Sequence, residues 1–389
     1  MNNLRIIELF GGIGACTQAL KQLNIPIEVV DYVEIDKYAV ASYNAINGTN
    51  FEPQDITTWD KDLKDIDLIM HGSPCQDFSI AGKQAGGDAN SGTRSSLMYE
   101  TIRIVSKIKP KYVIWENVKN LLSKKHKHNF DAYLQTMEEL GYKNYYQVLN
   151  AKDYGIPQNR ERVFTISILN GQDFKFPLKQ ELQLRLKDVL EDTVDEKYYL
   201  NDKQIERIKT TTYHVGQTRI QEKDYCDTLC ARDWKDPKCV RVGGIFDTEK
   251  SKHQAGSVYD EEGLAPTLDT MQGGWRQPCV EINDKTICLN SKGGRNGVEG
   301  LQPSLKDRVY DSNGISTCIA TSNFFMPNYT DKLKIRKLTP KECWRLMGFS
   351  DTAFEKAEKV NSNTQLYKQA GNSIVVNVLT EIFKKLFAH

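Results

Sequence analysis

One cysteine of this sequence lies where an α/β enzyme places a reactive group. Cys75 belongs to the motif Gly-Ser-Pro-Cys-Gln at residues 72–76, directly after an apolar run at residues 66–70 that predicts a buried strand. Reactive groups of open α/β enzymes gather at the carboxyl ends of such strands. Taken alone, a free cysteine is more often a small buried hydrophobic residue, so other residues must support a nucleophile.

Two further sets of polar residues adjoin predicted strands. Glu116 directly follows the apolar run 112–115, and Arg160 and Arg162 lead into the apolar run 163–169. Two residues apart on an extended segment, the arginines should project to the same side. A carboxylate that caps a helix and a solvated charged edge are the structural alternatives.

Together these residue types suit attack on a pyrimidine. A thiol with a pKa near 8.5 needs a polar or positive setting to become a nucleophile. When a thiolate adds to C6, electron density moves onto N3 and O2, where a carboxylic acid and an arginine can donate. C5 then becomes nucleophilic, and a sulfonium methyl group is the matching electrophile.

A glycine-rich turn predicts a nucleotide-like cofactor. The motif Phe-Gly-Gly-Ile-Gly at residues 10–14 joins the first predicted strand to the first helix, and Glu34 ends the second β-rich run. A carboxylate there accepts hydrogen bonds from ribose hydroxyls. Thr17 occupies the position of the third glycine of the dinucleotide fingerprint, which disfavours a dehydrogenase. A nucleoside cofactor without pyrophosphate is favoured, and S-adenosylmethionine is the common one.

These residues need a scaffold, and the first 170 residues predict a mostly parallel sheet. Strand-like runs alternate with helical segments, which is typical of βαβ units. The predicted strands are 5–10, 27–33, 67–71, 112–115, 145–150 and 162–169, and the predicted helices are 13–23, 37–46, 97–107 and 130–140.

The pattern changes after this region. Between about residues 172 and 334, short β-like runs and glycine doublets replace helical periodicity. Thr339 and Glu342 then form a capping box that opens a helix over 342–347. A helical stripe over 373–387, with Asn372 as its N-cap, needs a partner surface, and the first domain's sheet is the expected one. We therefore predict domains at 1–171 and 172–334, with 335–389 returning to complete the first.

Composition narrows the remaining choices. The chain of 389 residues has 52 Lys+Arg against 51 Asp+Glu, so a polyanion must be met by local cations rather than by bulk charge. No run approaches the ~20 apolar residues of a membrane span, and the start lacks the pattern of a signal peptide. Nine cysteines suit a reducing cytoplasm. Six lie within 226–318 without paired C-x2-C spacing, so we predict no metal.

Six motifs in order resemble those of the bacterial DNA (cytosine-5) methyltransferases. They occupy residues 10–14, 72–76, 116–118, 158–164, 336–349 and 369–373. The resemblance implies a Rossmann-like, S-adenosylmethionine-dependent methyltransferase domain with a mostly parallel sheet, plus a smaller, loop-rich, β-containing target recognition domain.

The resemblance also implies roles for single residues. Cys75 would add to C6, Glu116 would hold N3 and the exocyclic amine, and Arg162 would contact O2. Arg160 and Gln158 would shape the pocket and help order the catalytic loop.

For the cofactor, the resemblance implies a site lined by Phe10, Gly12, Gly14, Glu34, Asp55, Ile56, Leu97 and Asn372. Gln54 stands where the family more often has glycine. The segment 80–87 resembles the mobile loop that closes over extruded DNA, with Lys83 and Arg94 as phosphate partners. In the middle domain, Arg276 and Arg295 follow glycine doublets and are candidates for reading guanine in the major groove.

The expected function is transfer of a methyl group from S-adenosylmethionine to C5 of a flipped cytosine in a specific double-stranded DNA sequence, through a Cys75–C6 adduct. An RNA cytosine-5 methyltransferase and a catalytically silent DNA-binding relative are the alternatives. The expected setting is cytoplasmic and monomeric, with a cognate restriction endonuclease as a partner that forms no stable complex.

Overall fold

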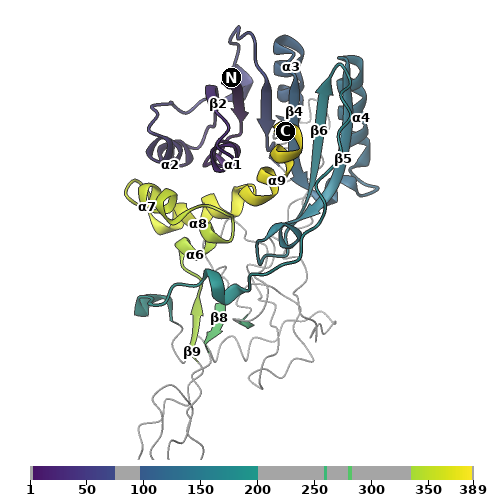
Figure 1. Ribbon diagram of the computed structural model, residues 1–389. Coiled ribbons are helices and arrows are strands. Elements are labelled where there is room, and N and C mark those ends of the chain that lie inside the picture. The colour runs from purple at the N-terminus through teal and green to yellow at the C-terminus, as the bar shows by residue number, and fades with distance from the viewer. Residues whose placement is uncertain (1–2, 75–96, 200–257, 261–278, 283–333, 388–389) are drawn as a thin grey trace, which may run out of the picture.

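A six-stranded sheet forms the centre of the computed structural model, which describes residues 3–74, 97–199, 258–260, 279–282 and 334–387 (Figure 1). Its strand order is β2-β1-β3-β4-β6-β5. The strands are β1 (Leu4–Leu9), β2 (Ile27–Val33), β3 (Leu68–His71), β4 (Tyr112–Val118), β5 (Tyr142–Asn150) and β6 (Glu161–Leu169). Strands β1 to β4 pair in parallel, whereas β6 is antiparallel to both β4 and β5. The predicted α/β class with a mostly parallel sheet is confirmed.

One predicted strand boundary is wrong in a way that matters. The apolar run 112–115 was expected to end before Glu116, but β4 continues through Glu116 to Val118. The physical reason is β6, which pairs with β4 as far as Val118 opposite Arg162. Backbone pairing thus extends the strand beyond its apolar part and places Glu116 on a rigid element.

Helices cover both faces of the sheet, because successive strand residues point to opposite faces. Ile6 and Ile114 belong to the core shared with the C-terminal helices, whereas Ile7 and Trp115 belong to the core on the other face. The helices of the first half are α1 (Ala15–Gln22), α2 (Lys37–Asn47), α3 (Met98–Ile108) and α4 (Lys127–Glu139). The short 3-10 helices are η1 (Ile56–Thr58), η3 (Lys119–Leu122), η4 (Ala151–Tyr154), η5 (Leu186–Val189) and η6 (Glu196–Tyr198).

The C-terminal segment returns to the first-half helices, as Figure 1 shows in yellow. It comprises α6 (Pro340–Arg345), α7 (Asp351–Glu358), α8 (Asn363–Asn372) and α9 (Val376–Phe387), with α9 against α1 and α7 and α8 against α2. The predicted apolar stripe of α9 is buried. The prediction that Asn372 caps this helix is wrong, because Asn372 is the last residue of α8. Ser373 is extended, so α9 begins only at Val376.

Three short strands form a second sheet in the order β7-β8-β9. They are β7 (Val258–Asp260), β8 (Cys279–Ile282) and β9 (Lys334–Lys337), with β7 parallel and β9 antiparallel to β8. The boundaries predicted for the middle domain stay a prediction.

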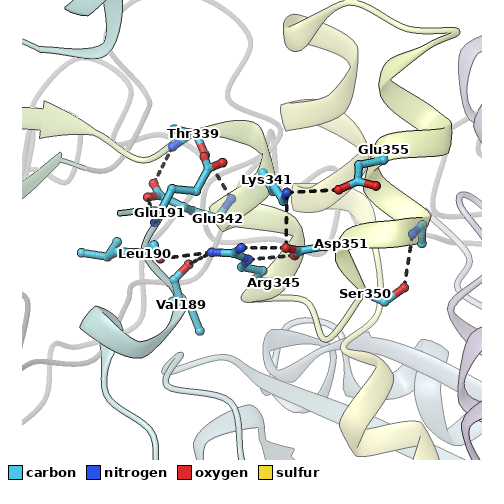
Figure 2. Close-up of polar contacts among 11 residues, drawn as sticks. Val189, Leu190, Glu191, Thr339, Lys341, Glu342, Arg345, Ser350, Asp351 and Glu355 are labelled. Atoms are coloured by element: carbon cyan, nitrogen blue, oxygen red, sulfur yellow. Dashed lines mark hydrogen bonds and ion pairs between the residues drawn. The ribbon is translucent and has the colours of Figure 1, made fainter. Parts of the chain in front are cut away.

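A polar cluster joins the segment before residue 200 to the segment after residue 333 (Figure 2). The predicted capping box is present, with Thr339 and Glu342 bonded reciprocally. Glu342 also accepts the backbone N–H of Glu191 at 2.8 Å. Arg345 donates to both carboxylate oxygens of Asp351 at 2.8 and 2.7 Å and to two carbonyls of the 189–190 segment at 3.1 Å. These bonds to Arg345 lower the pKa of Asp351 to about 2.

Candidate active site

Three parallel strands end at one edge of the sheet, and several predicted site residues follow them. In the register of the sheet, Leu9 of β1 lies beside His71 of β3, and His71 lies beside Trp115 of β4. The glycine-rich turn, the turn that leads to Cys75, and Glu116 each follow one of these three residues. This edge of the sheet is therefore the candidate active site.

The turn between β1 and α1 is held in a conformation that requires glycine. Gly12 and Gly14 have φ angles of +53° and +82°, and Gly14 is the N-cap of α1. A Cβ on Gly11 would lie 2.6 Å from the ring of Tyr32, so that position has no room for a side chain. The hydroxyl of Tyr32 donates to the carbonyl of Gly12 at 2.5 Å and so helps to hold the turn in place.

The Glu34 carboxylate is bonded to this turn. One carboxylate oxygen accepts the N–H of Gly12 at 3.1 Å, and the other accepts the N–H of Asp36 at 2.9 Å. Burial raises the pKa of Glu34, and the two N–H donors partly offset this effect. Each carboxylate oxygen has two lone pairs, so Glu34 keeps acceptor capacity for hydroxyl groups of a ligand.

The remaining predicted cofactor residues belong to other elements. Asp55 is exposed and caps η1, and the preceding Gln54 donates its backbone N–H to the carbonyl of Glu34, the residue after β2, at 2.8 Å. Ile56 is buried, and Leu97 packs against the same core. Asn372 is exposed at the end of α8.

Helix α8 is anchored on α2, next to Glu34. Lys368 donates to Asp36 at 2.6 Å, and Gln369 donates to the carbonyl of Tyr38 at 3.0 Å. Phe10, at the start of the turn, has a φ angle of +53°. The turn fits a nucleoside cofactor, because a Cβ on Gly12 would meet nothing within 4 Å and the Glu34 carboxylate is bonded to the Gly12 N–H.

A buried ion pair marks the other half of the site. Glu116 of β4 and Arg162 of β6 are 3.2 Å apart, with side chains only 12% and 16% exposed. Burial raises the pKa of Glu116, and the charges of Arg162 and Arg160 oppose this shift. Glu116 can therefore hold a proton more readily than a carboxyl in water while its orientation is fixed by a guanidinium.

Glu116 also lies against the turn that carries the predicted nucleophile. A Cβ added to Gly72 would be 3.7 Å from Glu116 Oε2. Ser73, the next residue, is buried; its hydroxyl accepts the indole N–H of Trp115 at 3.0 Å, and its carbonyl accepts the amide of Asn117 at 3.3 Å. The sequence did not lead us to predict these two hydrogen bonds to Ser73. Their signal was a tryptophan directly before Glu116 in a buried strand, since a buried indole N–H usually has a partner.

Arg160 and Gln158 were predicted to shape the pocket and to help order the catalytic loop, and these roles stay predictions. Arg160 is buried just before β6, and its Nη2 donates to the carbonyls of Gly371 and Ser373 at 3.0 and 2.9 Å. Gln158 likewise donates to the carbonyl of Leu346 at 2.8 Å. Both side chains therefore hold the C-terminal segment on the catalytic edge, and Arg160 also acts on Glu116 through its charge.

Five predicted residues lie outside the described residues. These are Cys75, Lys83, Arg94, Arg276 and Arg295. Among the residues that the structure describes, no group of three or more His, Cys, Asp or Glu side chains could hold a metal ion. None of the described helices is both long and apolar enough for a membrane span.

An edge with these properties suits an α/β enzyme that transfers a group from a nucleoside cofactor. The family model "C-5 cytosine-specific DNA methylase" matches residues 4–388. The chain belongs to this family of S-adenosylmethionine-dependent enzymes and is a DNA (cytosine-5)-methyltransferase.

Individual relatives agree over the whole chain. The orphan methyltransferase M.SPBetaI of Bacillus phage SPbeta is 33% identical and aligns with 99% of this chain and 98% of its own. The type II methyltransferase M.HhaI of Haemophilus parahaemolyticus is 34% identical, with 98% and 94% covered. The structure of the Entamoeba histolytica methyltransferase EhMeth, at 15% identity, covers 100% of this chain and 98% of its own with a TM-score of 0.64, which shows a shared fold.

Proposed function

We propose that this enzyme methylates a cytosine extruded from double-stranded DNA through a covalent adduct with Cys75. The observation that carries the proposal is the buried Glu116–Arg162 pair, with the Glu116 carboxylate against Gly72, three residues before Cys75. A base placed at this edge would meet a thiol, a proton donor and a guanidinium together. A stacked, paired base could not reach all three, so it must leave the duplex.

Each group has a role that its setting supports. The Cys75 thiolate forms a bond to C6, while Glu116 donates a proton or hydrogen bond to N3 and Arg162 stabilises charge on O2. The C5 carbon gains a methyl group, a base removes the C5 proton, and the S–C6 bond breaks to restore the thiolate. The raised pKa of Glu116 supports its role as a proton donor near neutral pH. Arg160 positions the surrounding backbone.

The cofactor residues are proposed to be Phe10, Gly12, Gly14, Glu34, Asp55, Ile56, Leu97 and Asn372. S-adenosylmethionine, when bound, supplies an electrophilic methyl group and leaves as S-adenosylhomocysteine. Glu34 binds the ribose hydroxyls, and its hydrogen bond from Gly12 couples ribose binding to the conformation of the turn. No metal takes part in the proposed reaction.

Target choice is assigned to residues 172–334, between a catalytic domain of residues 1–171 and its completing segment, 335–389. Lys83 and Arg94 are proposed to contact phosphates, and Arg276 and Arg295 to read bases. We also propose a cytoplasmic monomer that acts beside a restriction endonuclease without forming a stable complex with it. The relative M.HhaI, a type II methyltransferase, supports a restriction-modification setting, whereas M.SPBetaI is an orphan methyltransferase.

Two measurements test the reaction. Bisulfite sequencing of DNA from cells that express the chain should reveal methylated cytosines in one sequence context. Purified enzyme with S-adenosylmethionine should form a denaturant-stable adduct with that target carrying 5-fluorocytosine, because fluorine cannot leave C5 as a proton does. Cys75→Ser should abolish the adduct. Methylation without any adduct would overturn attack at C6, and an absence of methylated cytosine in every context would overturn the function.

A further inference from the structure

A short basic turn follows the catalytic strand β4. Strand β4 continues into η3 and then into a turn in which the N–H groups of His126 and Lys127 donate to the carbonyl of Ser123 at 3.0 and 2.8 Å. Leu121 before the turn and His126 at its end are buried. The turn is therefore fixed at both sides.

Lys124 and Lys125 occupy the tip of this turn, and both are exposed. Other lysines nearby are neutralised: Lys119 pairs with Glu161 at 2.9 Å, and Lys127 pairs with Asp131 at 2.6 Å. Lys124 and Lys125, in contrast, have no acidic group within 4 Å among the described parts of the chain. The turn thus presents two adjacent, uncompensated positive charges.

Lys124 and Lys125 follow β4 at the edge of the sheet where the candidate active site lies. Glu116 and the turn belong to one continuous stretch that leaves the carboxyl end of β4, so the lysines follow the proposed proton donor by eight and nine residues. The whole chain has a formal net charge of only +1. Attraction to a polyanion must therefore come from local charges such as these rather than from a field over the whole molecule.

We propose that Lys124 and Lys125 bind phosphates of the target DNA beside the extruded cytosine. This inference rests on the proposed function and adds a backbone-binding surface to it. Lysine ammonium groups bind phosphates as point charges and carry no sequence information, so the surface sets register and affinity rather than target choice. Anchoring by the buried Leu121 and His126 means that the turn loses little backbone freedom when DNA binds.

The test is the salt dependence of DNA binding by the full chain. Each phosphate contact contributes a slope of about 0.9 to the plot of log affinity against log salt. The double variant Lys124→Gln/Lys125→Gln should therefore lower the slope by about 1.8. Its affinity deficit relative to wild type should shrink by about 12-fold between 50 and 200 mM salt. Fluorescence anisotropy with a labelled duplex that contains the methylated context gives both quantities.

A matched control removes the same charge at the opposite edge. Lys64 and Lys109 are exposed, precede β3 and β4, and have no acidic group within 4 Å among the described residues. Lys64→Gln/Lys109→Gln should leave the slope unchanged. If both double variants lower the slope equally, the effect is due to net charge and the proposal is overturned. An unchanged slope in the Lys124/Lys125 variant would also overturn it, and an acidic protein would then be the remaining partner for the turn. Wild-type protein that fails to bind or methylate DNA would instead overturn the proposed function.

Discussion

The hydrogen bond between Trp115 and Ser73 gives a test of how the nucleophile's turn is held. Both side chains are almost completely buried, and their bond spans 42 residues of sequence at 3.0 Å. In Ser73→Ala the indole N–H loses its acceptor in a site without water access, which should cost about 1–3 kcal/mol of unfolding free energy. Trp115→Phe removes the indole N–H itself, so no buried donor is left without an acceptor, but the ring contacts with Tyr133 and Phe130 are reduced.

A double-mutant cycle separates these two effects. The double variant lacks both the donor and the acceptor, so its loss should be smaller than the sum of the single losses by about 1 kcal/mol. Urea unfolding followed by far-UV circular dichroism measures each corner without relying on tryptophan fluorescence. Ser106→Ala, which truncates an exposed serine on α3, is the control and should change stability by less than about 0.5 kcal/mol. Strictly additive losses would show that the bond does not hold the turn.

Three other predictions concern buried polar groups. Burial raises the pKa of Glu8 from 4.5 to about 7, so the folded state binds the carboxyl proton more tightly than the unfolded state does. The contribution of this proton to the free energy of unfolding is fully present below pH 4.5 and is lost as the pH rises through 7. Relative to Glu8→Gln, which stays neutral, wild type should therefore lose roughly 3 kcal/mol of unfolding free energy between pH 5 and 9, measured by urea titration; parallel profiles would refute the assignment. Arg160→Met should leave two buried carbonyls without their donor and destabilise the protein by about 3 kcal/mol, with Arg160→Lys in between; equal midpoints for all three would contradict the tether. Tyr32→Phe removes the donor to Gly12 and should weaken S-adenosylmethionine binding by roughly 5–10-fold in calorimetry, whereas an unchanged Kd would show that the turn holds its shape without it.

Several features of the fold could be predicted because they depend on neighbours in the sequence. Alternating apolar runs predicted the parallel strands, and the strand 27–33 was predicted with its observed bounds. The capping box at Thr339 and Glu342 needs only residues three apart, and it is present. Glycines at 12 and 14 were expected at a tight turn, and both have positive φ angles.

Contacts between distant segments were decided only by the tertiary structure. Asn372 had a plausible local role as an N-cap, but it ends α8, and Arg160, 211 residues before Gly371, donates to the carbonyls of Gly371 and Ser373 on either side of it. Glu116 belongs to β4 because β6, more than forty residues later, supplies its pairing partner. Short-range patterns determine which residues can form a helix, strand or cap, since those energies come from adjacent groups. Which buried donor meets which acceptor depends on how the elements pack, and no local pattern contains that information.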